Sequence, residues 1–246
     1  MQPTQSTETV LLMFSIIIPA HNEERYIADT LEHLSRLNYP KNRYEVIVIE
    51  NGSTDHTYEK ARAFENENTH AWNIPGKGVS TARNFALTKL NPKSDWVVSL
   101  DADTLLKSDF LLHLNDFLAA HSVRHFVVGT TEITPLSNGW IAKFWFFVYN
   151  LGHQLTKTSM SIQLFKTSLF SYVHLRFPEH LEMGEDLELI AKALKIGKFF
   201  YFPTKDVLTS VRRFEQEGWI KVFMHWNFVA LLPGRIQKHF TYKVVR

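Results

Sequence analysis

Apolar, β-branched runs alternate with helix-period segments through the first half of the chain, and this alternation constrains the fold more than any other feature. Phe14–Ile18 is the first run, and Glu23–Leu37 follows it with leucine and isoleucine at helical spacing. Tyr44–Ile49 is the second run, and the helical pattern of Asp55–Phe64 follows. These units predict an α/β fold with a Rossmann-like, mostly parallel central sheet flanked by helices.

Two further units extend the pattern. His70 begins a weaker strand, which leads through the Gly76-Lys77-Gly78 turn into a helix over Ser80–Leu90. Trp96–Leu100 is a clear apolar strand, and the helix Ser108–Ala120 follows it. In open sheets of this class, ligands bind beyond the carboxyl ends of the strands. The loops after the strands are therefore where a site is expected.

The second half of the chain, after about residue 122, has a less regular pattern. Strand-like stretches at Arg124–Gly129 and Lys198–Phe202 surround a helix at Asp186–Ile196. We expect this helix to direct Leu187, Ile190 and Leu194 inward. The 246 residues contain no repeat, low-complexity tract or flexible linker, so a single domain spanning 1–246 is expected. It divides into a regular half, 14–121, an irregular half, 122–217, and a C-terminal segment, 218–246.

Composition excludes several function classes. The net charge of +2 is too small for a whole-surface nucleic-acid binder, so no nucleic-acid partner is expected. With no cysteine there is no thiol chemistry and no cysteine-ligated zinc, which fits a cytoplasmic location. The first 13 residues lack Lys and Arg, unlike a secretory signal. The apolar stretch that ends at Pro19 is shorter than the roughly 18 residues of a membrane span.

Acidic and polar residues recur at the ends of the predicted strands. The first strand is followed by Pro19, Ala20, His21, Asn22 and Glu23, and the second by Glu50, Asn51, Gly52, Ser53, Thr54 and Asp55. Ser53, Thr54 and Asp55 have an ordinary structural interpretation, because such residues cap helices and favour the helix dipole. Glu50 lies at the end of its strand, where a ligand crevice would form.

The strand at Trp96–Leu100 leads directly into Asp101 and Asp103. Two carboxylates one residue apart at a strand exit can converge on one hard divalent cation, such as Mg²⁺ or Mn²⁺, which also neutralises phosphate oxygens. The alternative is a turn with solvated acids.

A third acidic motif, Gly184 to Glu188, opens the helix near residue 186 and contains Glu185 and Asp186. A carboxylate there either stabilises the helix dipole or acts as a general base facing the crevice. Four basic residues could meet phosphate, or could simply be solvated charges: Lys77, Arg83, Arg212 and Arg213.

Five motifs in this order resemble the inverting family-two glycosyltransferases with the GT-A fold. They are SIIIPAHNEERYI, VIVIENGSTDHT, GKGVSTARNFA, VVSLDADT and GEDLEL, and the resemblance covers residues 14 to about 196. It extends more weakly to SVRRFEQEGW at 210–219. The sequence departs from the usual pattern at His21, where the family often has Tyr, and at Glu50-Asn51, where it commonly has Asp-Asp or Asp-Asn.

The resemblance implies a role for each motif. The nucleotide sugar, with a UDP-sugar favoured, would contact Pro19, Ala20, His21, Glu23, Glu50, Asn51, Arg83 and Asp101. Asp101 and Asp103 would hold Mn²⁺ or Mg²⁺, and Asp186 would be the catalytic base. Lys77, Glu185, Arg212 and Arg213 would lie on the diphosphate or acceptor side. The implied reaction is a single inverting displacement onto the hydroxyl of a saccharide or lipid-linked acceptor, in surface polysaccharide or glycolipid synthesis.

Two other functions remain open from the residues alone. Asp101 to Leu105 also fits the motif of haloacid-dehalogenase-type phosphatases, with Asp101 as nucleophile and Asp103 as acid/base. That motif normally follows the first strand of its fold, and here three strand and helix units precede it. A non-catalytic nucleotide-sugar-binding module would be expected to lack Asp186 or the aspartate pair, and this chain has both.

The C-terminal segment 218–246 carries five Lys or Arg residues, no Asp or Glu, and many large apolar side chains. This mixture predicts either an interfacial helix on the anionic inner face of a membrane or a closing helix packed on the core. The aromatic stretch Trp140–Tyr149 allows the same two interpretations, an interfacial helix or a helix packed on the core.

Overall fold

The computed structural model describes residues 10–181 and 184–231, and the side chains of the last helix as far as His225. The strands are β1 Phe14–Ala20, β2 Tyr44–Asn51, β3 Thr69–Ile74, β4 Trp96–Leu100, β5 Thr104–Leu106, β6 Phe126–Thr131, β7 Thr134–Pro135, β8 Ile162–Lys166, β9 Lys198–Phe202 and β10 Val207–Thr209. The helices are α1 Ile27–Ser35, α2 Thr57–Arg62, α3 Val79–Leu87, α4 Phe110–Ala120, α5 Trp140–Thr156, α6 Ser168–Ser171, α7 Glu185–Ala193, α8 Arg212–Glu217 and α9 Trp219–Leu231. Short 3₁₀ turns lie at Lys41–Arg43 and Ser122–Arg124.

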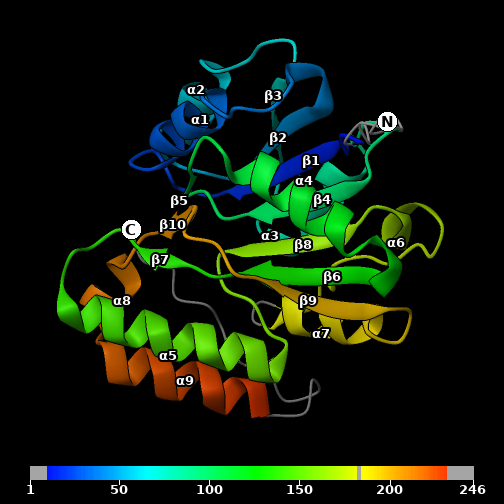
Figure 1. The fold of residues 1–246 in the computed structure, drawn as a ribbon. Helices are drawn as coiled ribbons and strands as arrows, with labels where there is room; N and C mark the ends of the chain where they lie inside the picture. Colours follow the sequence, from blue (N-terminus) through cyan, green and yellow to red (C-terminus); the bar gives the residue numbers. More distant parts are fainter. Residues whose placement is uncertain (1–9, 182–183, 232–246) are drawn as a thin grey trace, which may run out of the picture.

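The central sheet has seven strands in the order β3-β2-β1-β4-β8-β6-β9 (Figure 1). β1 pairs in parallel with both β2 and β4, so Phe14 lies opposite Tyr44 on one side and Trp96 on the other. β8 runs antiparallel to β4 and β6, and β6 is parallel to β9. The predicted mostly parallel α/β sheet is therefore confirmed, and the direction of chain progression reverses between β1 and β4.

Alternate residues of the central strands enter two hydrophobic clusters. Ile16 and Val48 join the cluster that includes α1 and α4, whereas Ile17 and Ile47 join the one that includes α3 and α7. Because successive strand side chains point to opposite faces, the β-branched runs bury both faces of the sheet. This explains why the runs lack the polar alternation of a half-exposed sheet.

The helix at the end of the irregular half differs in one respect from the sequence pattern. Of the three residues predicted to face inward, Ile190 is buried, whereas Leu187 and Leu194 are only partly buried. Leu189 and Ala193 are the other buried residues of the helix. The first turn contains Glu185, Asp186 and Glu188, and the buried face begins at Leu189, two residues after Leu187.

A second, three-stranded sheet has the order β5-β10-β7. β10 runs antiparallel to β5 and parallel to β7. Since β5 follows the aspartate motif directly, this small sheet fixes β10 and α8 beside it. α5 and α9 lie side by side at the end of the molecule furthest from α1 and α2 (Figure 1). No helix within the described ranges has both the length and the apolar character that crossing a bilayer requires.

Candidate active site

The candidate site lies at the carboxyl ends of β1 and β4, where the sheet order reverses. Such a reversal opens a crevice, because the loops that follow the two strands diverge to opposite faces. The β1 end leads into His21 and Glu23, and the β4 end leads into Asp101 and Asp103. The Asp101 amide donates a hydrogen bond to the Ser161 carbonyl (2.9 Å), which ties this loop to the start of β8.

Arg83 of α3 forms the first ion cluster in the crevice. Its Nη1 lies 2.8 Å from Glu185 Oε1, and its Nη2 lies 3.3 Å from Asp101 Oδ1. The guanidinium also stacks over the ring of Phe177, 5.3 Å from the ring centre. The Arg83 side chain is almost fully buried, whereas Asp101 keeps 41% of its side-chain surface accessible. Arg83 is thus fixed in place, and Asp101 presents a carboxylate face to the crevice.

Arg212, the first residue of α8, forms the second ion cluster. Its Nη1 and Nη2 donate hydrogen bonds to the two carboxylate oxygens of Glu23 (2.8 and 2.6 Å). Its Nε lies 3.0 Å from Asp103 Oδ2, and the guanidinium stacks 4.4 Å from the centre of the Tyr26 ring. Glu23 therefore contacts Arg212 with both oxygens, and its carboxylate is already bound within the protein. Arg213 instead pairs with Glu217 on its own helix (2.8 Å).

Asp186 lies in the first turn of α7, after Gly184, whose φ of 77° is in the left-handed region that glycine tolerates. Its Oδ2 accepts a hydrogen bond from Ser159 Oγ (3.0 Å), and its Oδ1 accepts one from the Leu187 amide (2.9 Å). These two hydrogen bonds hold the Asp186 side chain in one orientation. Asp186 lies beside the Arg83 cluster, because it directly follows Glu185, which is part of that cluster.

The site concentrates carboxyl groups in a poorly solvated space. Burial raises the pKa of Asp101 to about 7, with smaller contributions from Arg83, which lowers it, and from the Asp103 and Glu185 charges, which raise it. Burial also raises the pKa of Asp103, Glu185 and Asp186, against the lowering effects of Arg212 and Arg83. Groups whose pKa values are shifted in this way cluster at functional sites.

The β2 end carries the residues that the resemblance assigns to the nucleotide. Glu50 is buried, and its Oε1 accepts a hydrogen bond from the Ser53 amide (2.5 Å). The Asn51 carbonyl is 2.8 Å from His21 Nδ1, and Asn51 Nδ2 donates to the Gly78 carbonyl (2.9 Å). These contacts join the ends of β1 and β2 to the turn before α3.

The end of β1 and the Gly76–Gly78 turn complete this side of the crevice. Pro19 and Ala20 lie opposite Ile49 and Glu50 in the β1–β2 register. Gly52 has a φ of 72°, and a Cβ there would lie 2.4 Å from the Gly76 carbonyl oxygen, so only glycine allows the two turns to touch. Lys77 is exposed at the tip of its turn.

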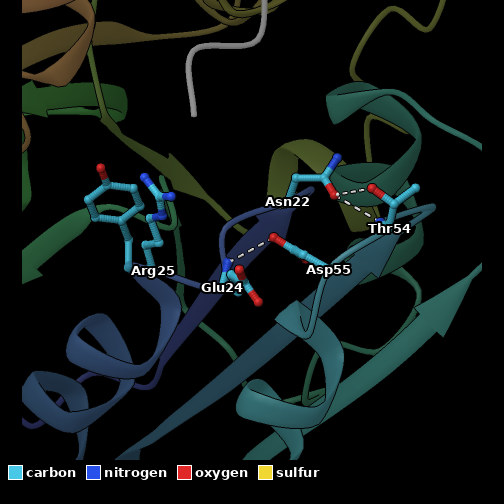
Figure 2. A pocket seen from close by; sticks show the side chains of 6 residues that line it. Asn22, Glu24, Arg25, Thr54 and Asp55 are labelled. Carbon is cyan, nitrogen blue, oxygen red and sulfur yellow. Dashed lines mark hydrogen bonds between the residues drawn. The ribbon is translucent and has the colours of Figure 1, made fainter.

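A small pocket of about 160 Å³ lies between the β1–α1 and β2–α2 loops (Figure 2). Asn22 Oδ1 accepts a hydrogen bond from the Thr54 amide (2.8 Å), and Asp55 Oδ2 accepts one from the Glu24 amide (3.3 Å). Asp55 Oδ1 also accepts the Thr57 amide (3.0 Å), so Asp55 organises the start of α2, in agreement with its structural interpretation. The pocket adjoins the Arg212 cluster through Tyr26 and does not include Asp101 or Asp186.

The donor set fits a divalent cation shared with a phosphate ligand. Asp101 and Asp103 supply hard carboxylate oxygens, and Mg²⁺-type sites often use one or two carboxylates with substrate phosphates and water. Across the described parts of the chain, no group of three or more His, Asp or Glu side chains is arranged to hold a metal ion. Both aspartates are paired with arginines instead, so a cation would have to compete with Arg83 and Arg212 for them.

Three residues of the site were missed from the sequence. Tyr26 stacks on Arg212, Phe177 stacks on Arg83, and Ser159 donates to Asp186. An aromatic in the NEERY motif was a weak signal for Tyr26. The other two lie in the irregular half, where no periodicity marks them.

Comparison with known proteins identifies the family of the chain. The family model described as "Glycosyl transferase family 2" matches residues 15–173. The chain belongs to glycosyl transferase family 2. Residues 186 and 212, which contribute to the crevice, lie beyond the stretch that the family 2 model matches.

Curated family 2 relatives are distant in sequence. The poly(ribitol-phosphate) beta-N-acetylglucosaminyltransferase TarS of Staphylococcus aureus is 24% identical over 211 residues, which is 79% of this chain and 36% of TarS. A second relative, from Methanococcus voltae, is 26% identical over 204 residues, which is 68% of this chain and 60% of that protein. Its name describes transfer of a diacetamido-dideoxy-glucuronosyl group to dolichyl N-acetyl-alpha-D-glucosaminyl phosphate. The chain thus spans about a third of the TarS length.

Solved structures confirm the predicted GT-A fold. Residues 1–349 of S. aureus TarS in complex with UDP-GlcNAc superpose with a TM-score of 0.66 at 23% identity, covering 81% of this chain and 58% of that one. The mannosyltransferase PcManGT of Pyrobaculum calidifontis, in complex with GDP-Man and Mn²⁺, gives a TM-score of 0.62 at 18% identity, covering 93% and 68%.

Proposed function

We propose that this chain is an inverting glycosyltransferase that moves a sugar from a nucleoside diphosphate sugar, with a UDP-sugar favoured, to an acceptor hydroxyl. The observation that carries the proposal is the position of Asp186, oriented by Ser159 in the crevice that also holds Asp101, Asp103 and Arg83. Family 2 membership and the UDP-GlcNAc complex of a TarS structure support the donor class.

Asp186 is the group that we assign as general base. Burial raises its pKa, which makes the carboxylate a better proton acceptor than a solvated one. As the acceptor oxygen attacks the anomeric carbon, its proton passes to Asp186 and the bond to the diphosphate oxygen breaks. One displacement inverts the anomeric configuration, and the products are the glycosylated acceptor and the nucleoside diphosphate.

The two arginine clusters would receive the leaving diphosphate. Guanidinium groups bind phosphate oxygens in a bidentate manner, and Arg83 is held rigidly by Glu185 and Phe177. Arg212 reaches the same crevice from α8 and is held by Glu23. Lys77, exposed in the turn before α3, is the third cation that we assign to the diphosphate side.

A divalent cation at Asp101 and Asp103 is part of the proposal. Among the described residues, the crevice contains five carboxyl groups, of Glu23, Asp101, Asp103, Glu185 and Asp186, and the two guanidinium groups of Arg83 and Arg212. Added positive charge would therefore favour binding of an anionic diphosphate. Bound Mn²⁺ or Mg²⁺ would supply that charge and neutralise the leaving group. The Mn²⁺ in the PcManGT complex supports this assignment.

For the acceptor, we propose a saccharide or a lipid-linked saccharide in surface polysaccharide or glycolipid synthesis. The relatives are named for transfer to poly(ribitol phosphate) and to a dolichyl-phosphate-linked sugar. A cytoplasmic location is part of the same proposal.

Calorimetric titration with UDP, GDP and ADP, with and without Mn²⁺ or Mg²⁺, tests the donor site. We expect metal-dependent binding of UDP. Release of UDP from a panel of UDP-sugars with added acceptors tests the transfer. Hydrolysis of phosphate monoesters with no nucleotide binding would instead support the phosphatase hypothesis, and nucleotide-sugar binding with no turnover would support a non-catalytic module.

A further inference from the structure

Helix α5 is apolar on two opposite faces. One face packs inside the protein: Ala142, Phe146, Tyr149, Asn150 and His153 are its buried residues. α9 lies along this side (Figure 1). The centre of its Phe223 ring is 5.2 Å from that of Trp145 and 5.9 Å from that of Tyr149. Of the two alternatives for this aromatic stretch, packing on the core therefore holds for the inner face.

The outer face of α5 carries large apolar side chains that are exposed to solvent. Between 47% and 77% of the surface is accessible for Trp140, Phe144, Phe147, Leu151 and Leu155. Their spacing of four, three, four and four residues places them in a single stripe along the helix. Ile220 and Met224 of α9, both 65% exposed, add apolar surface on the neighbouring helix. Contiguous exposed apolar surface of this kind marks an interaction site.

The lysines on α5 and α9 give these two helices a basic character. Lys143, Lys157 and Lys221 are exposed on α5, at its C-terminal end and on α9, and neither helix contains Asp or Glu. The sequence after α9, at 232–246, adds four Lys or Arg residues and no acid, although its structure lies outside the described residues. An apolar stripe bordered by lysines is complementary to a lipid surface with anionic headgroups.

We propose that the outer face of α5, together with Ile220 and Met224 of α9, docks on an anionic membrane. The lysine distribution favours lipid over a second copy of the chain. A symmetric contact through this face would bring the same basic helices of two molecules together, and like charges across an interface are unfavourable.

Chain connectivity links this face to the candidate base. Leu155, at the end of the stripe, is four residues before Ser159, which hydrogen-bonds to Asp186. Four extended residues span at most about 14 Å, so the end of the stripe lies near the acceptor side of the crevice. Docking would then present the crevice to a lipid-linked acceptor; this last step rests on the proposed function, whereas docking itself does not.

Vesicle co-sedimentation of the full chain tests the proposal. The vesicles contain phosphatidylcholine alone or mixed with phosphatidylglycerol, each at low and high salt. The test variant changes Phe144, Phe147 and Leu151 to Ser, and the matched control changes Val123, Tyr172 and Ile196, which are exposed apolar residues elsewhere, to Ser. Circular dichroism and UDP titration without vesicles check that both variants fold and keep their donor affinity.

We expect the wild type and the control to bind anionic vesicles, and to bind them more weakly at high salt. The α5 variant should bind at least about 100-fold more weakly than the wild type, because each large apolar side chain withdrawn from water contributes about tenfold or more to the affinity. Changing Lys143, Lys157 and Lys221 to Gln should weaken binding to anionic vesicles and reduce its salt dependence. Equal binding by the α5 variant and the control would overturn the proposal. So would absence of vesicle binding with a dimer in light scattering that the α5 variant abolishes. UDP binding without vesicle binding would refute docking and leave the proposed function standing. Vesicle binding without UDP binding would support docking and count against the proposed function.

Discussion

Arg212 and Glu23 form a bidentate ion pair across 189 residues of sequence. The pair joins α8, near the end of the described chain, to the loop that follows β1. Because Arg212 also contacts Asp103, the pair connects the acidic motif, the first loop and the C-terminal helices in one network. Removing either partner would leave a largely buried charge without its main counterion.

A double-mutant cycle on this pair should therefore show strong coupling. For Glu23→Gln and Arg212→Gln, we expect a coupling free energy of about 1–3 kcal/mol in denaturant unfolding. The exposed Glu32 and Arg36 pair on α1 is the matched control and should give about 0.5 kcal/mol or less. Equal coupling in the two pairs would mean that the Arg212 network does not stabilise the fold.

Asp103→Asn should weaken UDP binding in the presence of Mn²⁺ by about tenfold or more and remove its response to the metal, because one of two hard ligands is lost. Titration calorimetry with and without metal measures both effects. Asp116→Asn, an exposed change on α4, should bind UDP like the wild type. Unchanged metal dependence in Asp103→Asn would refute the assignment of this residue as a ligand.

Asp186→Asn should lower kcat by about 10²-fold or more and leave UDP affinity nearly unchanged, since the amide cannot accept the acceptor's proton. Steady-state transfer assays and UDP titration separate the two quantities. Glu188→Gln makes the same chemical change two residues further along α7, at a partly exposed position, and should keep wild-type kcat. Full turnover in Asp186→Asn would show that another group is the base.

His153 should make the fold sensitive to acid. Burial lowers the pKa of this imidazole to about 4, from an ordinary value of 6.5. The folded state thus binds fewer protons than the unfolded state between these two values, and stability is lost as the pH falls through this window. We expect the contribution of His153 to the free energy of unfolding to be about 2 kcal/mol smaller at pH 5 than at pH 7.

The measurement compares urea unfolding of the wild type and His153→Gln at both pH values. The variant should lose less stability on acidification than the wild type. His33→Gln, at a partly exposed position on α1, is the control and should leave the pH slope unchanged. Identical slopes for the wild type and His153→Gln would contradict the shifted pKa.

The sequence predicted the elements whose hydrophobic pattern matches their burial in the folded protein. β1, β2 and β4 were recognisable because strands buried on both faces are continuously apolar. α1 begins at Ile27, later than expected, because the Glu23 carbonyl accepts the Tyr26 and Ile27 amides in a preceding turn. β8 escaped prediction, since its antiparallel place between β4 and β6 depends on tertiary contacts that a five-residue run does not reveal.

The site was predictable in composition and less so in its contacts. Arg83, Asp101, Asp103, Glu185, Asp186 and Arg212 were named as site residues, and the structure brings them together in one crevice. The pairing of each aspartate with an arginine was not predictable, because strand ends specify which loops meet and not which side chains bond. The role of Glu23 shows the difference: the resemblance assigned it to the nucleotide, and its carboxylate binds Arg212. The catalytic and nucleotide-binding assignments themselves stay predictions.

The antiparallel insertion of β8 has a consequence for how the protein is made. β4 and β6 emerge from the ribosome before the strand that separates them, so a nascent chain that ends before Ile162 carries β4 as an unpaired sheet edge. An apolar edge strand of this kind is a template for aggregation until its partner arrives. We therefore expect chaperone binding at the β4 edge until β8 has left the ribosome.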